Sequence, residues 1–162
     1  MSRRSLGALV LPLAGRCAAP ADLPPKIVGL PPGAQPARLD PGALELINRE
    51  RVARGLPELR FDPRVGEAAL AHASDMARTG FMGHAGSDGA IAGERLSRAR
   101  YPWGFAAENV AHGYRDAAGV VAGWMGSEGH REAILSQAEV AAVARAGPED
   151  AAYWTAVFAG PC

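Results

Sequence analysis

This sequence contains little cysteine and lysine and has no net charge. Its 162 residues include 2 cysteines, too few for a disulfide scaffold. The 17 basic and 17 acidic side chains cancel, and no run of basic residues follows Arg4. The chain therefore lacks the positive surface that nucleic acids and anionic membranes attract, and we expect no nucleic-acid partner. With 48% hydrophobic residues, it can form one domain with an ordinary core.

No apolar run is long enough to cross a bilayer, but residues 1–21 have the features of an export signal. Arg3 and Arg4 precede a short apolar run over 6–14, and Ala19-Pro20-Ala21 offers small residues at a cleavage position. We expect a secreted or periplasmic protein with no transmembrane segment in its mature form. The arginine pair also partly resembles a twin-arginine signal, which leaves the export route open.

The two cysteines leave further alternatives. Arg16 precedes Cys17 where lipoprotein signals have a small residue, which argues against a lipid anchor. Cleavage after Ala21 would remove Cys17 with the leader. If Cys17 is retained, export makes a bridge between Cys17 and Cys162 chemically possible.

Prolines and capping residues divide the rest of the chain. Residues 22–38 are predicted to be a Pro-rich linker, and residues 39–160 a single domain. Asp40-Pro41 and Asp62-Pro63 each place an N-cap before a helical proline, which predicts two long helices. Shorter helices are expected over 91–99, after Asp116 and over 127–135, followed by an antiparallel pair of strands at 139–146 and 153–159. Helices early and strands late indicate an α+β domain.

Histidine and carboxylate side chains are the candidates for chemistry. Glu108 lies in the apolar segment 105–110, where a carboxylate is costly unless it is paired or serves a site. Together with His84 and His130 it would supply the two imidazoles and one carboxylate of an open zinc site. Their separations match no local metal motif, so zinc is one hypothesis among others.

The other histidines and Ser127 have simpler interpretations. His72 falls on the apolar face of the second helix, and a packed, hydrogen-bonded role is favoured for it and for His112. Ser127 is expected to cap the helix that follows it, with a contact to the imidazole of His130 as the alternative.

Six blocks follow one another along the chain: Leu46-Ile47-Asn48, Ala71-His72-Ala73, Gly80-Phe81-Met82, Ala107-Glu108-Asn109-Val110, Gly129-His130-Arg131 and Tyr153-Trp154-Thr155. This series resembles the bacterial branch of the CAP superfamily, which comprises cysteine-rich secretory, antigen 5 and pathogenesis-related 1 proteins. The resemblance implies a three-layer α-β-α sandwich with a small antiparallel sheet and a central cleft.

The resemblance also implies which residues line the cleft. In the family, residues matching His84 and Glu108 face it, and metal has been seen there in some members. Two further cleft residues of the eukaryotic members, a glutamate and a histidine, are replaced here by Ser127 and Tyr153. The full eukaryotic set is therefore absent, and only a bacterial variant in which His130 contributes remains. The implied cleft residues are therefore His84, Glu108, Ser127, His130 and Tyr153.

Two functions of different classes follow from the sequence. The first is a non-enzymatic binding module for a small apolar, peptide or cell-envelope ligand, as the family's largely non-enzymatic character suggests. The second is a metal-assisted hydrolase of peptide or envelope polymer, with zinc held by His84, Glu108 and His130. The distance between the two imidazoles discriminates between them.

Overall fold

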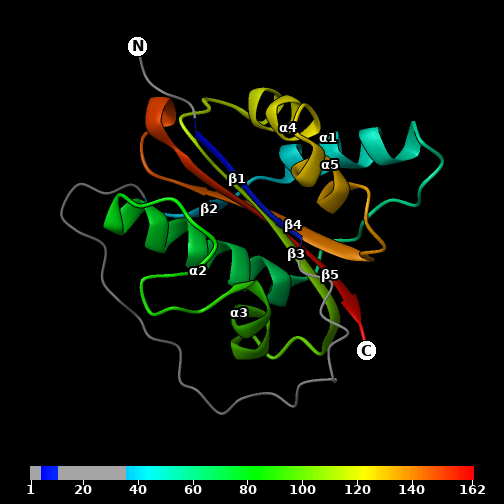
Figure 1. Cartoon of the computed structure of the whole chain (residues 1–162), viewed down its shortest axis with the longest axis horizontal. Helices are drawn as coiled ribbons and strands as arrows, with labels where there is room; N and C mark the ends of the chain where they lie inside the picture. Colours follow the sequence, from blue (N-terminus) through cyan, green and yellow to red (C-terminus); the bar gives the residue numbers. More distant parts are fainter. Residues whose placement is uncertain (1–4, 11–35) are drawn as a thin grey trace.

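A computed structural model describes residues 5–10 and 36–162. Within these residues a five-stranded sheet lies between two layers of helices (Figure 1). Neighbouring strands are antiparallel, in the order β1-β3-β5-β4-β2. The strands are β1 (Ser5–Val10), β2 (Arg38–Leu39), β3 (Trp103–His112), β4 (Val140–Ala146) and β5 (Tyr153–Pro161). The predicted C-terminal pair of strands is confirmed as β4 and β5.

The predicted helices are confirmed, and their ends follow from local chemistry. They are α1 (Pro41–Val52), α2 (Pro63–Thr79), α3 (Ala92–Arg98), α4 (Ala117–Met125) and α5 (Glu128–Ile134). The Asp40 carboxylate accepts the Ala43 amide at 3.0 Å, and Asp62 accepts the Arg64 amide at 2.8 Å. Gly80 ends α2 with φ of 68°, a conformation that glycine adopts at low cost.

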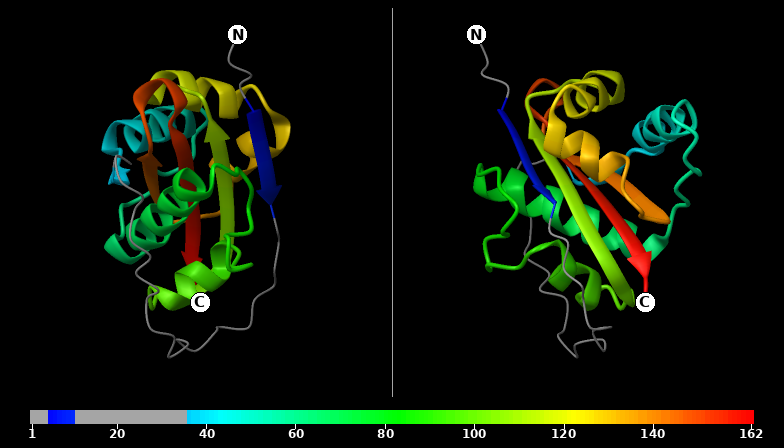
Figure 2. Two further views of the ribbon diagram at one scale, coloured as in Figure 1. Left: turned by 90° about the vertical axis from the view of Figure 1, so that its left-hand side faces the viewer. Right: turned by 45° about the vertical axis from the view of Figure 1, so that its right-hand side comes forward.

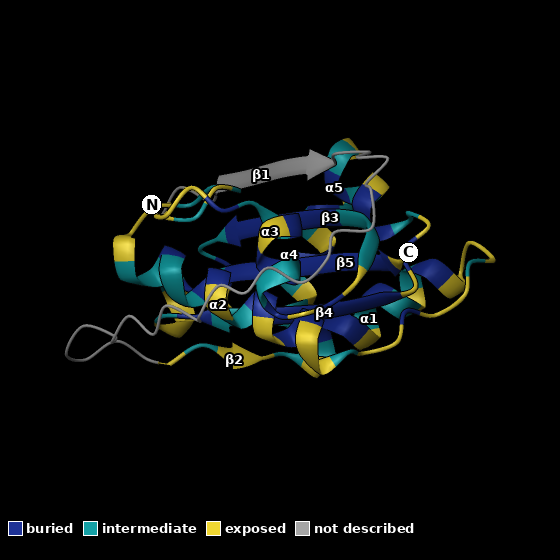
Figure 3. Ribbon diagram, turned by 90° about the horizontal axis from the view of Figure 1, so that it is seen from below, coloured by how far each residue is buried: buried dark blue, intermediate teal, exposed yellow. Residues whose placement is uncertain are grey.

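The two helical layers cover opposite faces of the sheet (Figures 1 and 2). Helices α1, α4 and α5 pack on one face around Trp124, Trp154 and Phe158. Helices α2 and α3 pack on the other face, around side chains that include Leu96 and Val157. Because successive strand residues point to opposite faces, β5 contributes to both cores, and the sheet is buried between them (Figure 3). The α-β-α sandwich is therefore confirmed.

Besides β1, two strands differ from the sequence expectation. β3 was not predicted as a strand, because Glu108 and Asn109 interrupt its apolar pattern. Arg38, assigned to the linker, pairs with Arg145 as part of β2. Among the described helices, none has both the length and the apolar character needed to span a bilayer.

Several sequence predictions lie outside the described residues. Of the predicted leader, only residues 5–10 are described, and they form β1. Residues 22–35 of the predicted linker and Cys17 are outside the described part of the chain. Cys162 is disulfide-bonded.

Candidate functional site

Glu108 is the centre of a buried polar cluster on the α2–α3 face of the sheet. It lies in the middle of β3 opposite Val157 of β5, and 2% of its surface is exposed. Since Val157 belongs to the core under α2 and α3, the Glu108 side chain points into the same layer. The strand thus carries a carboxylate into an otherwise apolar core, where it requires partners.

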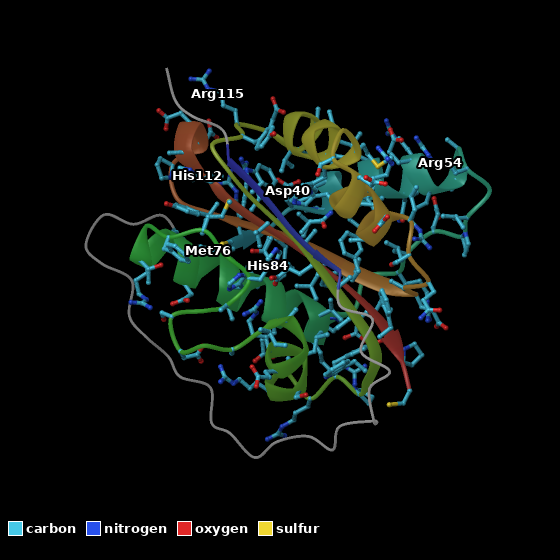
Figure 4. All side chains as sticks on the ribbon, viewed as in Figure 1. Asp40, Arg54, Met76, His84, His112 and Arg115 are labelled. Carbon is cyan, nitrogen blue, oxygen red and sulfur yellow. The ribbon has the colours of Figure 1, made fainter. Side chains whose placement is uncertain are left out.

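Both carboxylate oxygens of Glu108 are engaged. Oε1 accepts the Nδ1–H of His84 at 3.0 Å, and Oε2 accepts a guanidinium N–H of Arg95 at 2.6 Å. His72 Nε2 lies 3.7 Å from Oε1 and donates to the Gly83 carbonyl oxygen at 2.8 Å. Figure 4 shows His84 lying between the strands and α2.

The electrostatic balance of the cluster keeps Glu108 charged and His72 neutral. Burial alone would raise the pKa of Glu108, but the charge of Arg95 and the hydrogen bond from His84 outweigh it and lower the pKa below its ordinary value. Burial lowers the pKa of His72, because removing the ring from water disfavours the imidazolium. The result is a compensated ion pair beside a neutral imidazole.

Arg95 also holds the loop that carries His84. Its guanidinium donates to the His84 carbonyl oxygen at 3.1 Å and to the Ala90 carbonyl oxygen. The Glu108 carboxylate therefore anchors α3 and the ends of the 84–90 loop together. Arg95 acts mainly as a buried structural cation in this arrangement.

The middle of the 84–90 loop is tied to α2 by a second carboxylate. Asp75 accepts the Ser87 amide at 2.6 Å and the Ser87 hydroxyl at 2.7 Å. Asp88 accepts the Ala90 amide at 3.0 Å, a hydrogen bond typical of an aspartate in a turn. These bonds fix the loop beside the helix, so the space between them is preformed.

A cavity of about 330 Å³ opens between α2, this loop and α3. Its lining includes Ala71 and Asp75 from α2, Asp88 from the loop, and Arg98 from α3. His72 and Arg95 also line it, so the cavity adjoins the Glu108 cluster. Within the described part of the chain, His72 Nδ1 and Arg95 Nε have no hydrogen-bond partner.

His130 does not join His84 and Glu108, which corrects the predicted three-ligand site. The amide of Asn109 donates to the His130 carbonyl oxygen at 2.9 Å, so α5 lies on the Asn109 face of the sheet. Adjacent residues on a strand point to opposite faces, which puts Glu108 on the other side. Zinc bonds of about 2.0–2.2 Å cannot bridge a sheet.

The residues present do not fit a zinc ion in other ways. Over residues 5–10 and 36–162, no group of three histidine, cysteine or carboxylate residues could hold a metal. His84 and Glu108 are close, but the second carboxylate oxygen is bound to Arg95. His84 and Glu108 therefore do not form the three-ligand zinc site that a metal-assisted hydrolase needs.

The remaining predicted cleft residues lie apart from the cluster. Ser127 occupies the N-cap position of α5, yet its hydroxyl bonds to His130 Nδ1 at 2.8 Å and makes no side-chain cap. The alternative contact weighed for Ser127 is thus the one found. Tyr153 stacks on His112, with ring centroids 4.2 Å apart. Tyr153 precedes Val157 by four residues, or about 13 Å along β5.

The sequence missed two members of the cluster. His72 was interpreted as a packed core side chain, which is correct for its burial but omits its place beside Glu108. Arg95 was not among the predicted site residues, although it is the cation paired with Glu108. The available signal was Glu108 itself, because a buried carboxylate is stable only when a cation or hydrogen-bond donors pair with it.

The chain belongs to the Cysteine-rich secretory protein family, CAP, whose pattern it matches over residues 44–158. Two relatives come from Bacillus subtilis (strain 168). The uncharacterized membrane protein YlbC is 36% identical over 93 residues, which cover 57% of this chain and 27% of YlbC. The uncharacterized protein YkwD is 30% identical over 117 residues, or 72% of this chain and 45% of YkwD. The chain thus spans less than half the length of either relative.

Solved structures agree with the family assignment. An extracellular protein containing an SCP domain from Bacillus anthracis str. Ames superposes with a TM-score of 0.67 and 29% identity, over 74% of this chain and 39% of that one. An outer surface protein from Borrelia burgdorferi superposes with a TM-score of 0.66 over 74% of this chain and 90% of its own. At 19% identity, the second likeness concerns the fold alone.

Proposed function

We propose that this chain is an exported, non-enzymatic binding module whose ligand occupies the cavity between α2, the 84–90 loop and α3. The observation that carries the proposal is the cavity itself. At about 330 Å³ it lies within the range of small-molecule sites, roughly 300–1,000 Å³. The ties from Asp75 and Arg95 to the loop hold its walls in place before any ligand arrives.

The state of Glu108 favours binding over catalysis. A general base works best with a pKa near the working pH, whereas Glu108 has a lowered pKa and both oxygens in use. The serine–histidine contact at Ser127 and His130 lies on the opposite face of the sheet, so it cannot act with Glu108 on one substrate atom.

The lining of the cavity combines small apolar side chains with charged ones, so it suits a ligand that has both kinds of surface. The charged side chains are paired with one another, Arg78 with Asp75 and Arg98 with Asp88. A ligand with both donors and acceptors, such as a peptide or a cell-envelope fragment, matches such a surface. The neutral His72 ring donates through Nε2, so its Nδ1 is an acceptor at the cavity wall.

Export is the second part of the proposal. The support is the pattern of residues 1–21, with an arginine pair, a short apolar run and small residues. The similar SCP-domain protein of Bacillus anthracis is extracellular, which is consistent with export of this chain. A secreted or periplasmic binding module is the interpretation that joins both features.

A pocket-filling variant tests the binding site. Ala71 is exposed on α2 and lines the cavity, so Ala71→Trp should fill it; Ala122→Trp, at an exposed position of α4, is the matched control. Protein recovered from its own envelope extract is compared by native mass spectrometry. We expect a bound species on the wild type and on Ala122→Trp, and its loss from Ala71→Trp. An identical bound species on all three folded proteins would refute this site.

A further inference from the structure

The outer edge of β3 is completed by a segment from the far N-terminus of the chain. β1 pairs antiparallel with β3 over six residues, with Ser5 opposite His112 and Val10 opposite Ala107. It forms one edge of the sheet, beside β3 and α5 (Figure 2). Without β1, the edge of the sheet would be β3 itself.

An uncovered β3 would be a good acceptor for another strand. Exposed edge strands present unpaired N–H and C=O groups, and proteins usually protect them with lysine, proline, bulges or short length. β3 is ten residues long and contains no lysine or proline, and its register shift between Trp103 and Phe105 lies outside the stretch that pairs with β1. Its one carboxylate, Glu108, is directed at Arg95 and does not guard the edge.

The direction of the backbone groups follows from the hydrogen bonds on the other side of β3. The Gly113 amide donates to the Ala152 carbonyl oxygen, next to β5. Since backbone groups alternate along an antiparallel strand, Ala111 and Asn109 also face β5. This leaves Val110 and Glu108 facing β1.

The occupant of the edge is a segment of unusual composition for a surface strand. Ser5–Val10 reads SLGALV, with no charged residue and no proline. It belongs to the apolar run expected to be removed on export.

We propose that the β1-facing edge of β3 is a strand-addition site for an extended, uncharged, apolar peptide, a site that Ser5–Val10 occupies in the full chain. Main-chain hydrogen bonds supply the affinity in this mode of recognition. The acceptor edge rests on the pairing of β1 with β3 and not on the proposed export. The edge is separate from the cavity, because the cavity is lined by residues of α2, the following loop and α3.

Two adjacent prolines in the full chain test the acceptor edge. Gly7 lies opposite Val110, so its N–H faces β3, and Gly7→Pro removes a bond of the ladder. Ala8 lies opposite Asn109, whose backbone faces β5, so the N–H of Ala8 points away from β3 and Ala8→Pro is the matched control. Hydrogen exchange of the Val110 and Glu108 amides reports whether β1 is in place.

The probe is a fluorescent peptide of sequence SLGALV with a charged solubilising tail, followed by anisotropy. A tethered strand has an effective concentration on the order of millimolar, so the peptide should compete poorly with β1 in the wild type. We expect Gly7→Pro to lose protection at Val110 and Glu108 at least about tenfold, to bind the peptide at least about tenfold more tightly than Ala8→Pro, and to regain protection on binding.

Three results would overturn the proposal. The first is fast exchange of the Val110 and Glu108 amides in the wild type, because β1 would then not pair. The second is a Gly7→Pro protein that is folded and unprotected at β3 but binds no peptide. The third is dimerisation of Gly7→Pro through β3, since the edge would then accept a second copy of the chain. None of these results bears on the Ala71→Trp test of the cavity.

Discussion

Replacing Arg95 with methionine should leave Glu108 as a buried carboxylate without its cation. Arg95 donates to Glu108 Oε2 at 2.6 Å and to the His84 carbonyl oxygen at 3.1 Å, and 2% of Glu108 is exposed. Removing one partner of such a pair costs about 3–5 kcal/mol, because the remaining charge stays out of water. Since the free energy of unfolding of a typical domain is about 5–15 kcal/mol, Arg95→Met should be much less stable than the wild type but still folded enough for its stability to be measured.

Urea unfolding followed by tryptophan fluorescence measures the effect, since Trp124 and Trp154 are fully buried. The double variant Arg95→Met/Glu108→Gln removes the stranded charge and should recover at least about 2 kcal/mol of the loss. Arg98→Met, on the same helix with a partly exposed pair to Asp88, should cost less than about 1 kcal/mol. The reasoning fails if Arg95→Met costs no more than Arg98→Met, or if the double variant is no more stable than the single one.

Three further predictions concern the rest of the domain. Arg51 is 1% exposed and donates to the carbonyl oxygens of Pro57, Ile134 and Ser136. Arg51→Met should therefore lower the free energy of unfolding in urea by about 3–5 kcal/mol, whereas the exposed Arg54→Met should lower it by less than about 0.5 kcal/mol. Similar losses in the two variants would contradict this prediction. The pKa of His72 is lowered below 6.5 in the folded protein, so the unfolded chain binds more protons and the wild type loses stability as the pH falls through 6.5. The difference in unfolding free energy between about pH 7 and about pH 5 should therefore be smaller in His72→Gln. An unchanged difference would mean that His72 titrates normally. Gly80→Ala should lower stability by about 1 kcal/mol at its positive φ, and a neutral result would contradict the left-handed cap of α2.

Local chemistry made the helices and the last two strands predictable from the sequence. Aspartate–proline pairs start α1 and α2, and both signals act within a few residues. The β-branched and aromatic runs of β4 and β5 are similarly local. β3 was not predicted because its central residues, Glu108 and Asn109, are polar. They are stabilised there by hydrogen bonds with α3 and α5, which no local sequence pattern reveals.

The candidate site was only partly predictable for the same reason. Glu108 was found because a carboxylate in an apolar segment is visible in the sequence, and His84 was named with it as an imidazole of the same hypothetical zinc site. The error on His130 was one of strand geometry: Asn109, not Glu108, faces α5. Had residues 103–112 been recognised as a strand, the alternation of its side chains would have separated His130 from Glu108.

The central claim is that the cavity beside α2, and not a metal at the His84–Glu108 pair, receives the ligand. A crystal structure of protein purified directly from its envelope extract, with data collected at the zinc absorption edge, tests this most directly. The account predicts ligand density in the cavity near Ala71 and Asp88, and no zinc peak beside His84. An empty cavity together with a zinc peak bound by His84 and Glu108 would contradict it.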